Sequence, residues 1–123
     1  QFNVFSVNHP AQKGIADYMA DAETYLGLNN FFQQKRDLFL NLIAESRFKF
    51  MPSKGTYFQV LDYSKITDEH DVDFAKRLTK EFKIASIPLS VFNENNKDDK
   101  VLRFCFAKTD ETLIKASEIL CRI

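Results

Sequence analysis

Apolar residues recur at helical spacing through the first third of the chain. A helix is predicted to open at His9-Pro10, because proline suits a first turn, where its missing N–H costs nothing. Gly27 is predicted to cap the end of that helix. One of the two asparagines at 29–30 is predicted to cap a second, longer helix that reaches about Ser46. Residues 1–8 are predicted to form an extended, mostly apolar lead-in.

After residue 47 the pattern changes to the alternation of apolar and polar residues that is typical of strands. This pattern predicts strands at 48–50, 56–61, 83–88 and 101–106, helices over 72–82 and from Thr109 onward, and a solvated loop at 93–100. The succession predicts an α/β fold in which helices pack against a small mixed sheet. Because helical crossovers join strands that run the same way, some strand pairs are expected to be parallel.

The charges of the chain balance, which narrows the classes of partner. Lys plus Arg and Asp plus Glu number 17 each, so the formal net charge is zero. Neither nucleic acid nor a membrane is therefore an expected partner. Cys105 and Cys121 match neither a zinc spacing nor a disulfide framework, which favours a reducing, cytoplasmic setting. The 13 phenylalanines and the start inside an apolar run fit a fragment of a larger protein.

Arg103 is the strongest candidate for a ligand-binding residue. Leu102, Phe104 and Phe106 share the face of its strand that is expected to enter the core, and Arg103 shares the other face with Cys105. An arginine in so apolar a strand is costly to desolvate unless a carboxylate or phosphate meets it. Its planar fork can hold a carboxylate by two parallel hydrogen bonds. From the residues alone, an internal salt bridge and a solvated position on the open sheet face remain alternatives.

The other reactive residue types are interpreted as structural. Lys54 lies in a proline-containing turn and is interpreted as a turn lysine, not as a Schiff-base lysine. His9 is interpreted as a helix-start residue, His70 as a solvated residue and Cys105 as a packed thiol. An acidic cluster before the 72–82 helix lacks the order of a calcium-binding loop and is interpreted as a solvated helix entry. Its members are Asp62, Asp68, Glu69, Asp71 and Asp73.

Several stretches occur in an order and at a spacing that resemble one enzyme family. The three most specific are Gly55-Thr56-Tyr57-Phe58, Ala85-Ser86-Ile87-Pro88-Leu89-Ser90-Val91-Phe92 and Leu102-Arg103-Phe104-Cys105-Phe106-Ala107-Lys108. Upstream matches are Gln1-Phe2-Asn3-Val4-Phe5, Pro10-Ala11-Gln12 and Lys35-Arg36-Asp37. Over nearly its whole length the chain resembles the C-terminal region of class I/II pyridoxal-phosphate aminotransferases. The resemblance is to the branch of kynurenine aminotransferase, glutamine transaminase K and methionine aminotransferase.

The resemblance implies a fold-type-I architecture with a large and a small domain. Residues 1–27 would end the large cofactor domain, 28–46 would form a long interdomain helix and 47–123 would form most of the small C-terminal domain. The resemblance also implies pyridoxal 5'-phosphate as the cofactor, amino-acid and 2-oxo-acid substrates, and a homodimer. In this family the arginine of the third stretch binds the α-carboxylate of the substrate, and Arg103 holds that position.

The resemblance also implies which groups this chain does not supply. In family members the Schiff-base lysine, the aspartate that pairs the pyridine nitrogen and the phosphate-binding groups all precede the position of Gln1. No catalytic, cofactor-binding or metal-binding residue is therefore expected here, and Asn93 follows Phe92 where the family commonly has tyrosine. The functional prediction is a C-terminal fragment of an aminotransferase, inactive alone, with Arg103 binding the substrate. The alternative is a free-standing α/β module that binds a small carboxylate through Arg103.

Overall fold

A computed structural model describes residues 6–123, so the predicted lead-in lies mostly outside the described residues. The described residues divide into two compact units, one that ends at Phe31 and one that spans residues 32–123. Within the described residues, no helix is both long enough and apolar enough to cross a membrane.

The first unit contains a broken helix where one continuous helix was predicted. Helix α1 (His9–Tyr18) opens as predicted, and the side chain of Asn8 caps it by accepting a 2.9 Å hydrogen bond from the Ala11 N–H. The chain then turns before α2 (Glu23–Leu26). Asp21 causes this break: its Oδ1 accepts from the Glu23 N–H at 3.0 Å, and its carbonyl accepts from the Thr24 hydroxyl at 2.7 Å. Such local bonds compete with helix continuation.

Helix α3 (Leu28–Leu42) begins and ends earlier than predicted. Gly27 is a C-cap residue as predicted, at the end of α2, and it has the ordinary helical conformation (φ −75°, ψ −14°). The asparagines at 29–30 lie inside α3 and do not cap it, contrary to the prediction. At the other end the buried Ser46 hydroxyl donates to the Ile43 carbonyl at 2.7 Å. That carbonyl is thereby used locally, which favours a turn over a further helical turn.

The second unit is built on a three-stranded antiparallel sheet. Its strands are β1 (Phe58–Asp62), β2 (Ile87–Pro88) and β3 (Val101–Cys105), in the spatial order β1-β3-β2. The expectation of parallel pairs is wrong for these strands, because both flanking strands pair antiparallel with β3. The crossover through α4 (Asp71–Phe82) does leave β1 and β2 running the same way, but β3 is inserted between them. The predicted 48–50 strand is reduced to a single bridge between Lys49 and Asp62.

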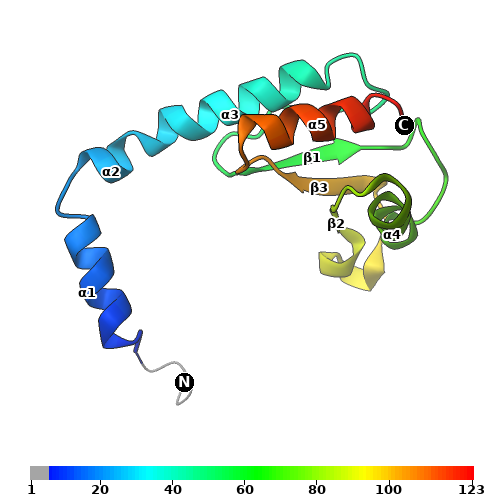
Figure 1. The fold of residues 1–123 in the computed structure, drawn as a ribbon. Coiled ribbons are helices and arrows are strands. Elements are labelled where there is room, and N and C mark those ends of the chain that lie inside the picture. The colour runs from blue at the N-terminus through cyan, green and yellow to red at the C-terminus, as the bar shows by residue number, and fades with distance from the viewer. Residues whose placement is uncertain (1–5) are drawn as a thin grey trace. The chain divides into compact units, whose positions relative to one another are not determined.

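Helices cover one face of this sheet (Figure 1). Alternation in β3 is as predicted, because Leu102, Phe104 and Phe106 are all buried. They share one core cluster with residues of α3, α4 and α5 (Asp110–Leu120), among them Phe39, Phe74, Leu78, Leu113 and Leu120. Thr109 caps α5 as predicted, accepting a 3.4 Å hydrogen bond from the Thr112 N–H. The predicted 93–100 loop contains the short 3-10 helix η2 (Glu94–Asn96), after η1 (Ser90–Phe92).

Candidate functional site

Arg103 lies in the middle of the central strand, on the sheet face that points away from the core. In the strand register it is paired with Val60 of β1 and with Ile87 of β2. Directly paired residues project to the same face, so these three side chains form a row across the sheet. Val60 and Ile87 are both exposed. The row therefore belongs to the open face, as the alternation around Arg103 predicted.

The guanidinium of Arg103 is bounded by aromatic rings and has no acidic partner. Its Cζ lies 4.2 Å from the ring centroid of Phe58 and 5.7 Å from that of Phe92. Its Nε is buried and has no hydrogen-bond partner. No carboxylate of the described residues forms an ion pair with it, so an internal salt bridge is not what holds this arginine. Stacked rings cover the face of a guanidinium and leave its N–H edge available to a planar anion.

A cavity of about 350 Å³ adjoins Arg103. Lys83 and Lys108 also line it, and no aspartate or glutamate does. The rest of the lining is mostly apolar and includes Phe58 and Ile87 near Arg103 and the core residues Phe104, Leu113 and Leu120. Cationic walls without a counter-charge attract an anion, and this volume lies within the range of small-molecule sites. The geometry and charge therefore fit a small carboxylate.

A buried acidic residue at the start of α4 binds Ser90 in the short helix η1. Asp71 is 1% exposed, although the sequence pattern predicted a solvated helix entry, and that prediction is wrong for Asp71. Its Oδ2 accepts from the Ser90 N–H at 2.7 Å and its Oδ1 from the Ser90 hydroxyl at 2.6 Å. No pattern in the sequence marks this pair, because the two residues belong to different elements and one sits in a run of acidic residues.

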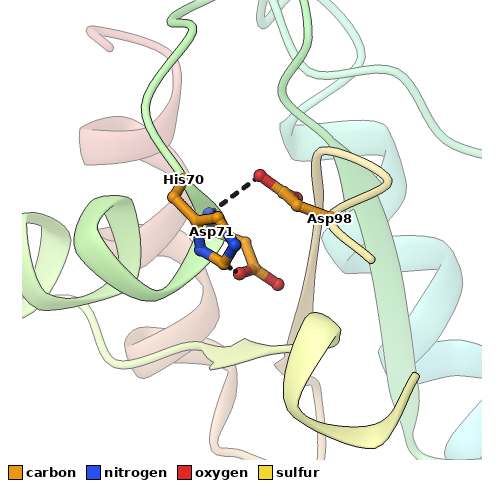
Figure 2. Close-up of side chains that lie close together, drawn as sticks. All are labelled: His70, Asp71 and Asp98. Carbon is orange, nitrogen blue, oxygen red and sulfur yellow. Dashed lines mark hydrogen bonds and ion pairs between the residues drawn. The ribbon is translucent and has the colours of Figure 1, made fainter. Parts of the chain in front are cut away.

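His70, Asp71 and Asp98 lie close together at the start of α4 (Figure 2). His70 caps the helix, with its Nδ1 3.4 Å from the Val72 N–H, and the same nitrogen lies 3.0 Å from Asp71 Oδ1. The Asp71 N–H donates to Asp98 Oδ2 at 3.2 Å. Although three such groups can hold a metal, their oxygens already accept protein hydrogen bonds. We interpret the cluster as a structural anchor.

Asp98 is the second anchoring residue of the cluster at the start of α4. It accepts from the Lys100 N–H at 2.8 Å, and the Lys100 ammonium lies 3.0 Å from it. Burial by itself would raise the pKa of Asp98, but these hydrogen bonds and the one from Asp71 outweigh it and hold the pKa below its usual value. Burial, then the charges of Asp98 and Asp71, raises the pKa of Tyr63, whose hydroxyl donates to Asp98 as a neutral group.

Replacing Asp98 by asparagine should weaken the fold at neutral pH and not in acid. A carboxyl whose pKa is depressed by folding contributes stability above its unfolded pKa of about 3.9, and this contribution disappears as pH falls through the folded pKa. Asp98→Asn should lower the free energy of unfolding by about 1–3 kcal/mol at pH 7, with the difference shrinking toward pH 3. Urea denaturation at pH 7, 5 and 3 measures it. Asp99→Asn, at an exposed ion pair, is the control and should change little.

The other residues singled out from the sequence are Lys54, His9, His70, Cys105 and Asn93. Lys54 is exposed in a bend, as expected of a turn lysine, and His9 begins α1 as expected. His70 is exposed but serves as a helix cap, which the interpretation as a solvated residue missed. Cys105 is a partly buried free thiol that lines the cavity. The Asn93 amide donates within its own loop, to the Lys97 carbonyl at 2.8 Å.

Comparison with known proteins decides the family. The family model for aminotransferase class I and II matches residues 2–120. The chain belongs to the class I and II aminotransferases. This aminotransferase chain is 46% identical over 121 residues to methionine aminotransferase of Escherichia coli (strain K12), a match covering 98% of this chain and 31% of that protein. It is 31% identical over 140 residues to kynurenine–oxoglutarate transaminase 3 of Homo sapiens, again covering 98% and 31%.

The solved structures agree with this family. A crystal structure of an Escherichia coli protein with a methionine aminotransferase function superposes with a TM-score of 0.89 at 45% identity, covering all of this chain and 32% of that one. The chain thus spans about a third of the length of the relatives it matches. The predicted family is confirmed, and so is the predicted α/β fold of the C-terminal region of a fold-type-I aminotransferase. The free-standing binding module is not favoured.

Aminotransferases of this family use pyridoxal phosphate. Such a cofactor needs a Schiff-base lysine and a partner for its pyridine nitrogen. Within the described residues, the cavity beside Arg103 has no carboxylate in its lining that could pair with that nitrogen, and Lys54 lies in an exposed bend. These residues do not form a cofactor site by themselves.

Proposed function

We propose that this chain is the C-terminal part of a pyridoxal-phosphate-dependent aminotransferase, in which Arg103 binds the α-carboxylate of the substrate. The parent enzyme would move an amino group from an amino acid to a 2-oxo acid. One observation carries the role of Arg103: no carboxylate of the described residues forms an ion pair with it, and it lies beside a cavity lined by two lysines and by no acidic residue. A guanidinium without a counter-charge favours a carboxylate partner, which it binds by charge-assisted hydrogen bonds.

Arg103 would act by binding and orienting the substrate. Two parallel hydrogen bonds from a guanidinium fix both the position and the plane of a carboxylate, which limits the orientations of the adjoining Cα. The cofactor supplies the electron sink in such enzymes. We further propose that residues 1–27 end a large domain, that 28–46 bridge to the small domain 47–123, and that the parent enzyme is a cytoplasmic homodimer.

The proposed function predicts opposite behaviour for the chain and for the enzyme that contains it. The reading frame upstream of Gln1 should encode roughly 200–250 further residues, including the Schiff-base lysine. Protein expressed with that extension should transfer amino groups from amino acids to 2-oxo acids when pyridoxal phosphate is added. Residues 1–123 alone should show neither transfer nor a cofactor-dependent visible absorption band.

Free pyridoxal phosphate can form adducts with lysines of residues 1–123 and so give a visible band. The variant Lys54→Arg is the control for such adducts. A stoichiometric visible band in residues 1–123 that disappears in Lys54→Arg would make Lys54 a cofactor lysine and contradict the proposal. An extended protein that binds carboxylates but transfers no amino group would support the binding module instead.

A further inference from the structure

We propose that Asp71 is a positioning residue for the substrate site: through Ser90 it holds Phe92 against the guanidinium of Arg103. The inference rests on the proposed function, because it concerns how Arg103 is kept ready to bind a carboxylate. It adds two residues that touch no substrate, Asp71 and Ser90, to the set on which binding depends.

Asp71 and Ser90 are joined by two short hydrogen bonds in a buried position. Both residues are 1% exposed. The two carboxylate oxygens accept separately from the Ser90 N–H at 2.7 Å and from the Ser90 hydroxyl at 2.6 Å. A carboxylate that accepts one bond from a backbone N–H and one from a side chain fixes the position and the direction of that backbone. Asp71 also lies in the first turn of α4, where the helix dipole favours a negative charge.

The anchored segment touches Arg103 on both sides of Ser90. Ahead of it, Ile87 is paired with Arg103 across the β2–β3 ladder. After it, Phe92 ends η1 with its ring centroid 5.7 Å from the Arg103 Cζ. Phe92 is 67% exposed, so little packing surrounds its ring. Its position depends on the backbone of η1, and the hydrogen bonds to Asp71 hold that backbone.

Asp71 also binds the segment that leads into β3. Its N–H donates at 3.2 Å to Asp98, which lies just before β3, the strand of Arg103 (Figure 2). The same residue therefore joins the segment that carries Phe92 and the segment that leads to Arg103. A shift of either segment relative to the other would change how the ring meets the guanidinium.

The test is a double-mutant cycle in the full-length enzyme with Ser90→Ala and Phe92→Leu. Ser90→Ala removes one of the two bonds to Asp71 and keeps the other, so the fold should survive. Each single variant should raise KM for amino acids about threefold to tenfold with kcat nearly unchanged, because binding of the carboxylate is weakened and the chemical step is not. The double variant should be no worse than Phe92→Leu, because both act through the same ring.

Ser117→Ala is the matched control. Ser117 is as buried as Ser90, at 2% exposed, but its hydroxyl has no partner, so its loss should leave KM unchanged. If Ser90→Ala leaves KM unchanged while Arg103→Lys raises it, the positioning role is overturned and the proposed function stands. Additive effects of Ser90→Ala and Phe92→Leu would also overturn it. If neither Ser90→Ala nor Arg103→Lys changes KM, the proposed function fails and this inference fails with it.

Discussion

Replacing Arg103 by lysine in the full-length enzyme should raise KM for every amino-acid substrate and lower kcat/KM about 10-fold to 100-fold. Lysine keeps the positive charge but cannot form two parallel hydrogen bonds with a carboxylate, and the loss of a charge-assisted hydrogen bond costs about 1.5–3 kcal/mol. The effect should be the same for substrates with different side chains, because all of them share the α-carboxylate. Steady-state kinetics with three or more amino acids measures it.

Arg77→Lys is the matched control for this change. Arg77 also stacks on an aromatic ring, with its Cζ 5.0 Å from the Phe74 centroid, and it forms a double hydrogen bond with Glu69. It does not line the cavity beside Arg103. The Arg77 variant should keep the KM of the wild type. An unchanged KM in Arg103→Lys would remove Arg103 from the substrate site.

Leu61→Ala should lower the free energy of unfolding of the chain by about 2–5 kcal/mol. Leu61 is 0% exposed and pairs with Leu102, which is also 0% exposed, so truncation leaves a cavity in the centre of the core. Urea denaturation followed by circular dichroism measures the change. A loss below about 1 kcal/mol would mean that this face of β1 is not the core face.

Val60→Ala is the control for Leu61→Ala within the same strand. Val60 is 39% exposed on the face of Arg103, so its truncation should cost less than about 1 kcal/mol. The ratio of the two effects also tests the register of β1. A slip by one residue would exchange the faces and reverse the ranking.

Elements with a regular apolar period and two helix starts could be predicted from the sequence, but most other element ends could not. The alternation around Arg103 and the Thr109 cap are correct because neighbouring residues decide them. The break of the first helix depends on local bonds of Asp21 and Thr24, which an apolar stripe does not reveal. The insertion of β3 between β1 and β2 depends on pairing between distant segments, so alternation alone could not show that the sheet is antiparallel.

Less of the candidate site than of the fold was accessible from the sequence. Arg103 could be singled out because a cation in an apolar strand is conspicuous, and the resemblance gave it a role. Phe58 and Phe92 lie within the matched stretches, yet their contact with Arg103 depends on how β1, η1 and β3 meet in space. Asp71 was misjudged because an acidic run is usually solvated, and only the fold shows that one member points inward to Ser90.

The central position of β3 has a consequence for synthesis on the ribosome. Both flanking strands emerge before it, and β1 and β2 do not pair with each other. Until Val101–Cys105 has been made, β2 has no ladder partner among the described residues, and β1 has among them only its bridge to Lys49. Open strand edges recruit other chains, so the nascent protein is most exposed to aggregation just before its last fifth emerges. Premature termination before that point would leave both strand edges that face β3 unpaired and would remove Arg103.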